Sequence, residues 1–196
     1  IHACTATATP RVREDILAQL DLRDAELLVG SFDRPNLTYR IRPRENRRAQ
    51  ILDEVRRHAG EAVIIYALSR RDTEQIADAL RAAGVSAAHY HAGMSRDQRD
   101  HVHEMFAREQ LDVVVATVAF GMGIDRSNVR AVIHASMPRS IEHYQQETGR
   151  GGRDGDPAEC VLLHSYADFE RWKSLAERSF EEAAAETDDP APLRQE

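Results

Sequence analysis

The residues in this chain that are best suited to chemistry are two arginines in its second half. Arg150 and Arg153 stand in the run Tyr144–Gly155, which reads YQQETGRGGRDG. A guanidinium is permanently charged and binds phosphate oxygens through two parallel hydrogen bonds. Because residues three apart share one side of a helical turn, both side chains can address one phosphate group. We expect the three glycines of this run that flank Arg150 to break the helix just where the arginines project. The alternative is an ordinary helix C-terminus, with a glycine cap and arginines that complement the helix dipole.

A second phosphate-binding pattern lies in the middle of the chain. Ser69 and Arg70 follow an apolar run that ends at Ala67, and a helical pattern begins directly after them. The N–H groups at a helix start, a hydroxyl and an arginine together suit a phosphate. The alternative is a simple N-cap serine with an exposed arginine beside it.

Two glycines mark a third candidate. The run Val113–Asp125 reads VVVATVAFGMGID, with Gly121 and Gly123 placed after its apolar part. Glycine lets the backbone approach a ligand closely. We therefore expect this loop to face a ligand, although a lone pair of glycines is a common pattern.

His89 and His91 stand on one face of an expected strand and could form part of a metal site. No third ligand stands near them in sequence, and His101 and His103 have the wrong helical spacing to complete a site. We therefore expect no bound metal.

Lysine usage limits what the chain can do with a nucleotide. Only one of its 26 basic residues is a lysine, Lys173, and no glycine-rich loop precedes it. A Walker A loop needs such a lysine on the β- and γ-phosphates, and the D-E-x-H metal motif of helicases is also missing. We therefore expect that the chain alone cannot hold ATP and Mg²⁺, and that it carries half of a split site.

The arginine run resembles the last conserved motif of the RecQ-family DNA helicases. In that family both arginines approach the γ-phosphate of ATP across a cleft between two RecA-like lobes. The resemblance therefore implies that Arg150 and Arg153 are arginine fingers, with Gln146 and Gly149 beside the nucleotide. Glu147 favours RecQ proteins over RNA-directed helicases, which carry a basic or polar residue there.

Other segments extend the resemblance over roughly residues 1–170. The string Phe32–Tyr39, FDRPNLTY, is similar to a RecQ segment, and Arg34 before Pro35 must be extended, as suits a lobe junction. One position departs, because Gly151 stands where the family usually has alanine. The resemblance implies three further groups of site residues: Thr5 and Thr7 for coupling, Ser69, Arg70, His91, Gly93 and Thr117 for DNA binding, and Gly121, Gly123 and Asp125 for nucleotide binding.

The resemblance implies the second lobe of an ATP-dependent DNA helicase that moves 3′ to 5′ and serves DNA repair and recombination. ATP and Mg²⁺ would be held mainly by the first lobe, and the partners would be single-stranded and forked DNA. An RNA-directed helicase lobe and a non-catalytic binding module are the alternatives. The intact arginines and Asp125 argue against the second of these. We expect a cytoplasmic protein, associated with the nucleoid if it is bacterial.

These residues must be positioned by an alternation of strands and helices. Apolar strands separated by amphipathic helices predict a RecA-like α/β fold, in which a parallel sheet is covered on both faces. Ligands bind beyond the carboxyl ends of such strands, and we expect all the motifs there. The expected strands are 62–67, 85–90, 112–117, 130–135 and 159–164. The expected helices are 45–58, 72–83 and 95–109, the last with a capping box at Ser95. A further helix, capped by Ser140, is expected to lead to the arginines.

The chain divides into three predicted parts. Residues 1–35 would be a remnant of a first lobe, with strands at 1–5 and 26–31 and a helix capped by Thr9 and Pro10. Residues 36–168 would form the second lobe, and residues 169–196 a terminal helix, expected to begin at Ser165, with an acidic tail.

The charge and composition of the chain are compatible with a lobe that binds nucleic acid. The net charge is −7, of which the nine acids and four bases from residue 168 onward contribute −5. The rest of the chain is thus nearly neutral and can hold a local basic track. Its apolar runs fall short of the roughly 18 residues that span a membrane, so we expect no membrane partner. Cys4 and Cys160 are expected to be buried thiols.

Overall fold

The computed structural model describes residues 3, 9–21, 25–30, 33–117 and 126–187, with side chains up to 178. The chain divides into two compact units, Ile1–Pro35 and Asn36–Glu196. The second unit contains a six-stranded sheet in the order β1-β6-β5-β2-β4-β3, and every pair of neighbours in it is parallel. The strands are β1 (Leu37–Pro43), β2 (Ala62–Tyr66), β3 (Ala87–Tyr90), β4 (Val113–Ala116), β5 (Val129–His134) and β6 (Ala158–His164).

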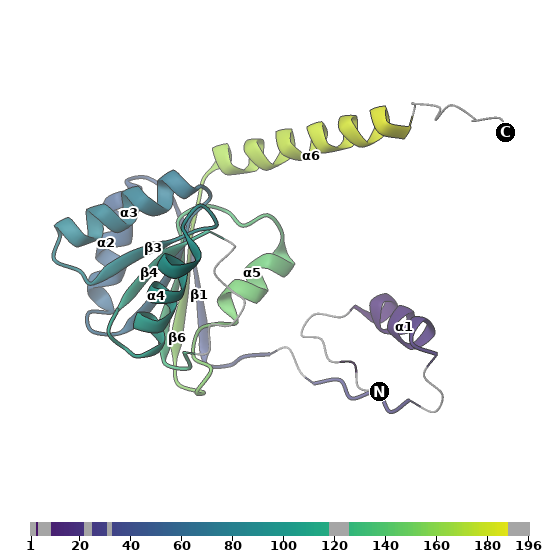
Figure 1. The fold of residues 1–196 in the computed structure, drawn as a ribbon, viewed down its shortest axis with the longest axis horizontal. Helices are drawn as coiled ribbons and strands as arrows, with labels where there is room; N and C mark the ends of the chain where they lie inside the picture. The colour runs from purple at the N-terminus through teal and green to yellow at the C-terminus, as the bar shows by residue number, and fades with distance from the viewer. Residues whose placement is uncertain (1–2, 4–8, 22–24, 31–32, 118–125, 188–196) are drawn as a thin grey trace. The chain divides into compact units, whose positions relative to one another are not determined.

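Helices cover both faces of this sheet (Figure 1). Apolar residues of α2 and α3 pack against one face, and those of α4 pack against the other. The helix α5 lies on the same face as α4, where the Cys160 thiol donates to the carbonyl oxygen of Thr148 at 4.0 Å. The helices are α1 (Pro10–Gln19), α2 (Arg47–Arg57), α3 (Arg70–Ala82), α4 (Arg96–Ala107), α5 (Ile141–Thr148) and α6 (Tyr166–Thr187).

The predicted parallel α/β fold is confirmed, and the ends of the predicted elements in this unit differ by only one or two residues. All residues of β2 and β4 are buried, which explains why these runs are apolar without alternation. The Ser95 capping box is present. The edge strand β1 was not among the expected strands, because six of its seven residues are at least partly exposed and its sequence, LTYRIRP, is half polar.

Polar contacts fix the first half of α6 to the rest of the second unit. The indole N–H of Trp172 donates to the carbonyl oxygen of Met137 at 2.9 Å. Asp168 is buried, forms an ion pair of 2.9 Å with Arg44 and accepts from the backbone N–H of Met137. Within the described residues, no helix is both long and apolar enough to span a membrane.

The described residues of the first unit form one helix, α1. Thr9 caps α1, with Pro10 at its first position, as predicted. The predicted strand at 26–31 is wrong over its described part, because residues 25–30 form no strand and Leu27, Leu28 and Val29 are exposed. A strand needs a hydrogen-bonded neighbour, and the described residues of this unit offer none. The predicted strand at 1–5 lies almost wholly outside the described residues.

Candidate nucleotide and nucleic-acid site

The helix that leads to the arginines begins and ends as predicted. The Ser140 hydroxyl accepts from the N–H of His143, and Glu142 lies in the first turn. The helix ends at Thr148 with Gly149 as its C-cap, so Arg150 and Arg153 lie in the turn that follows. The predicted break of the helix at the glycines is therefore confirmed, and it is not a regular helical turn that aligns the two arginines. The three glycines between residues 149 and 152 favour this end, because glycine is a poor helix former.

Gly152 sets the shape of this turn. Its φ is +52°, and a Cβ there would lie 2.5 Å from Asn36 Nδ2 and from the Asp156 carbonyl oxygen. Asn36 Nδ2 donates to the Gly152 carbonyl oxygen at 2.8 Å. Gly151 is not left-handed, and the nearest atom to a Cβ there would be Ala158 Cβ at 3.4 Å. Gly152 therefore requires glycine, whereas Gly151 has room for alanine.

The same turn lies near the amino end of the sheet. The N–H of Gly152 donates to the carbonyl oxygen of Val129, the first residue of β5, at 2.9 Å. The expectation that all the motifs follow the carboxyl ends of strands is therefore wrong for this turn. The reason is that α5 begins after β5 ends and returns the chain along the sheet by about 1.5 Å per residue.

Arg150 lies in this turn and is half-buried. Its positive charge lies near Tyr66, the last residue of β2. Burial raises the pKa of the Tyr66 hydroxyl, and the nearby Arg150 charge opposes this rise. Arg153 and Gln146 are exposed, whereas Gly149 and Arg150 are half-buried.

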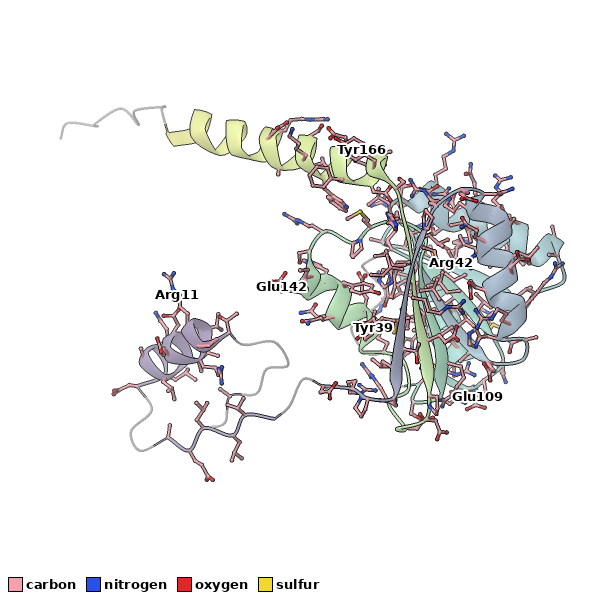
Figure 2. The ribbon with its side chains drawn as sticks, turned by 180° about the vertical axis from the view of Figure 1, so that it is seen from behind. Arg11, Tyr39, Arg42, Glu109, Glu142 and Tyr166 are labelled. Carbon is pink, nitrogen blue, oxygen red and sulfur yellow. The ribbon has the colours of Figure 1, made fainter. Side chains whose placement is uncertain are left out.

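A buried polar cluster lies under α5 and was not predicted. The rings of Tyr66 and His134 stack with centroids 5.3 Å apart, and Tyr144 meets His134 edge-on at 4.8 Å. His134 Nε2 and a Glu147 carboxylate oxygen are 2.7 Å apart, and both residues are buried. Tyr39 of the edge strand β1, labelled in Figure 2, lies 6.0 Å from the Tyr144 ring. A tyrosine and a histidine at the ends of the largely apolar strands β2 and β5 were the available signal.

The predicted DNA-binding residues follow the carboxyl ends of three neighbouring strands. Ser69 follows β2 and caps α3, its hydroxyl accepting from the N–H of Asp72 at 3.2 Å. Thr117 follows β4, and its N–H donates to the carbonyl oxygen of Tyr90, which ends β3, at 3.2 Å. Because the sheet order is β2-β4-β3, these segments share one edge of the sheet.

Arg70 and Gly93 are in close contact at this edge. A Cβ at Gly93 would lie 3.1 Å from Arg70 Nη1 and 3.2 Å from Arg70 Cδ. Both residues are exposed, whereas His91 is buried. The N–H of Gly93 donates to His91 Nδ1 at 3.2 Å, and His91 Nε2 lies 3.0 Å from a Glu74 oxygen. We therefore expect His91 to influence DNA through the loop that it supports.

Glu74 adds a third possible metal ligand to the pair His89 and His91. Glu74, His89 and His91 each offer one possible ligand atom, and these three atoms lie within 4.8 Å of one another. The expectation of no third ligand nearby is therefore wrong. The hydrogen bonds of His91 oppose a metal, however. A ligating histidine usually donates from its other ring nitrogen, and here His91 Nδ1 faces the N–H donor of Gly93. Burial, and then the neighbouring His91, lower the pKa of His89.

Five predicted site residues lie outside the described residues. These are Thr5, Thr7, Gly121, Gly123 and Asp125.

Comparison with known proteins places the chain in a family. The profile of the helicase conserved C-terminal domain matches residues 46–155. The ATP-dependent DNA helicase RecQ of Pasteurella multocida is 50% identical over 169 residues, which is 86% of this chain and 27% of that protein. RecQ of Bacillus subtilis is 42% identical over 96% of this chain and 32% of that protein. The chain belongs to the RecQ family of helicases and corresponds to their C-terminal helicase domain.

The likeness of this RecQ domain extends to eukaryotes. The RecQ-like DNA helicase BLM of Xenopus laevis is 45% identical over 88% of this chain and 13% of that protein. The domain thus spans about a third or less of the length of these curated relatives.

Solved structures support the fold of the RecQ domain. Dbp5 of S. cerevisiae bound to RNA and ADP BeF3 superposes with a TM-score of 0.70 at 17% identity, over 88% of this chain and 47% of that chain. The E. coli DEAD-box protein SrmB has a TM-score of 0.58 at 23% identity, over 64% of this chain and 76% of that chain. At this identity the two structures show the RecA-like fold alone.

Proposed function

We propose that this RecQ domain is the second lobe of an ATP-dependent DNA helicase and supplies two arginines to ATP bound on a first lobe. The observation that carries the proposal is the turn after α5, where Arg150 is half-buried and Arg153 is exposed three residues later. Relatives that are named ATP-dependent DNA helicases support it. An arginine at the transferring phosphate contributes about 10³- to 10⁵-fold in rate in related reactions.

The residues of this lobe would act by charge and position. Arg150 and Arg153 would neutralise the negative charge that builds up on the γ-phosphate oxygens, and Gln146 and Gly149 would lie beside the nucleotide. Bound ATP and Mg²⁺ would supply the reacting phosphoryl group and the metal charge. Gln146 and Arg153 are both exposed and so can reach an anion outside the lobe. The lobe by itself should hydrolyse no ATP, because its only lysine lies outside any phosphate-binding loop.

The DNA track would follow the shared edge of β2, β4 and β3. Arg70 at the start of α3, the exposed backbone at Gly93 and the half-buried Thr117 would contact backbone phosphates. Such contacts are independent of base sequence, as a translocating enzyme requires. The family resemblance supports movement from 3′ to 5′.

An unwinding assay tests this function in a protein that carries the lobe together with its first lobe. DNA duplexes that carry a single 3′ tail, a single 5′ tail or a fork with both tails, and a forked RNA duplex, would be compared in the presence of ATP. Among the single-tailed duplexes, we expect only the 3′-tailed one to be separated. Separation of the RNA alone would favour the RNA-directed alternative, and DNA binding without separation of any fork would favour a non-catalytic module.

A further inference from the structure

Glu74 lies on α3, one helical turn after Arg70. Because residues four apart share one face of a helix, the two side chains leave α3 on the same side. A carboxylate oxygen of Glu74 lies 3.0 Å from Nε2 of His91, which belongs to the loop after β3. The His91 side chain is buried, whereas the Glu74 side chain is 48% exposed. A surface carboxylate of α3 thus contacts a buried ring of the neighbouring loop.

The hydrogen bonds of His91 determine where its ring proton lies. Its Nδ1 lies 3.2 Å from the backbone nitrogen of Gly93, and a backbone N–H can only donate. Nδ1 is therefore the unprotonated nitrogen, and the proton of the neutral ring lies on Nε2. The Nε2–H then donates to the Glu74 carboxylate in a charge-assisted hydrogen bond. Glu74 thus stabilises the tautomer in which His91 can hold the Gly93 backbone.

The loop that His91 holds packs directly against Arg70. A Cβ at Gly93 would lie 3.1 Å from Arg70 Nη1 and 3.2 Å from Arg70 Cδ. The position of the Gly93 backbone therefore limits the directions that are open to the Arg70 guanidinium. The contacts from Glu74 through His91 to Gly93 form a bridge that begins on α3 and ends beside the first side chain of the same helix.

We propose that Glu74 is a positioning residue for the contact of Arg70 with DNA. This inference rests on the proposed function, which places DNA phosphates along this edge of the sheet. The carboxylate sets the tautomer of His91, and His91 fixes the Gly93 backbone beside Arg70. An arginine side chain has several rotatable bonds, so holding it in advance avoids part of the entropy cost of binding a phosphate.

The sign of the effect on DNA affinity separates this role from simple electrostatics. Glu74 is negative and lies near a track for a polyanion, so charge alone predicts that its removal strengthens DNA binding. Positioning predicts weaker binding, because loss of the carboxylate releases His91 and the loop beside Arg70. A purely structural role would lower the free energy of unfolding and leave the DNA affinity of the folded protein unchanged.

Glu74→Ala is the test variant, and Asp78→Ala is its matched control. Asp78 lies one turn later on α3 and pairs with Arg81, so its removal makes the same change in charge and leaves the Glu74–His91 contact in place. Fluorescence anisotropy of a labelled oligothymidylate measures binding to the two-lobed protein at several salt concentrations. We expect Glu74→Ala to weaken binding about three- to ten-fold. Asp78→Ala should bind as tightly as the parent or more tightly.

The salt dependence and a conservative variant test the same bridge. The slope of log K against log salt concentration should fall in magnitude by up to about 0.7 in Glu74→Ala, the share of one phosphate contact. Glu74→Gln keeps an oxygen that accepts from His91 Nε2–H, so it should retain the parental slope and at least the parental affinity. An equal loss of affinity in Glu74→Gln and Glu74→Ala would overturn the positioning role.

Arg70→Ala separates this inference from the proposed function. In the Arg70→Ala background, adding Glu74→Ala should weaken binding no further, because the two residues act in series. Parental affinity and slope for Arg70→Ala would contradict the proposed DNA track itself. Weaker binding by Arg70→Ala, together with a Glu74→Ala variant that binds like Asp78→Ala, would overturn only the positioning role of Glu74.

Discussion

The imidazole of His134 and the carboxylate of Glu147 lie 2.7 Å apart in the buried layer between the sheet and α5. His134 ends β5, and Glu147 lies in the last turn of α5, so the contact ties the helix to the strand that precedes it. The turn that carries Arg150 begins directly after this helix. The position of both arginines therefore depends on a polar contact inside the domain.

Breaking that contact should destabilise the lobe. Glu147→Ala would leave the buried His134 Nε2 without its partner, which typically costs about 1–3 kcal/mol. Glu147→Gln keeps a hydrogen-bond acceptor and should cost less. Urea unfolding of the two variants measures the difference, and an unchanged free energy of unfolding for Glu147→Ala would mean that the contact contributes nothing.

The two neighbouring glycines should respond oppositely to alanine. Gly152→Ala should lower the free energy of unfolding by about 1 kcal/mol or more, because its backbone is left-handed and its Cβ would clash. Gly151→Ala is the matched control. It should be neutral or stabilising by up to about 1 kcal/mol, since alanine fits there and restricts the unfolded chain. Urea midpoints with unchanged m-values decide both, and a larger loss at Gly151 would reverse the assignment.

Arg70 should contribute one phosphate contact to DNA binding. The slope of log K against log salt concentration should fall in magnitude by about 0.7 in Arg70→Ala, as expected for one contact to single-stranded DNA. Arg71→Ala removes the adjacent exposed arginine and should leave the slope nearly unchanged. Fluorescence anisotropy with labelled single strands at several salt concentrations gives both slopes. Equal changes in the two variants would exclude a specific contact by Arg70.

Local patterns predicted most of this fold for identifiable physical reasons. The buried strands β2 and β4 are continuous apolar runs, and Ser95, Ser140 and Thr9 are cap residues that act on their own neighbours in sequence. The edge strand β1 was missed because its stability comes from pairing with β6, which is more than 100 residues away in sequence.

The candidate site was predictable in its residue types and less so in its geometry. Spacing placed Arg150 and Arg153 on one side of a turn, and the glycines beside them predicted the end of the helix. The shape of the turn was not predictable, because the left-handed Gly152 packs against Asn36, which is distant in sequence. Tyr66 and Glu74 were missed for the same reason. Their partners His134 and His91 come from other elements, and nothing in the local sequence indicates those contacts.

The most direct test of the account is the rate of ATP hydrolysis by Arg153→Ala in the two-lobed protein. Arg139→Ala is the matched control, because it removes an exposed arginine from the loop before the same helix. With saturating single-stranded DNA and ATP, we expect Arg153→Ala to lower kcat by about 10³-fold or more while ATP still binds. Arg139→Ala should retain the parental rate. A parental kcat for Arg153→Ala would contradict the claim that this lobe supplies Arg153 to the reacting phosphate.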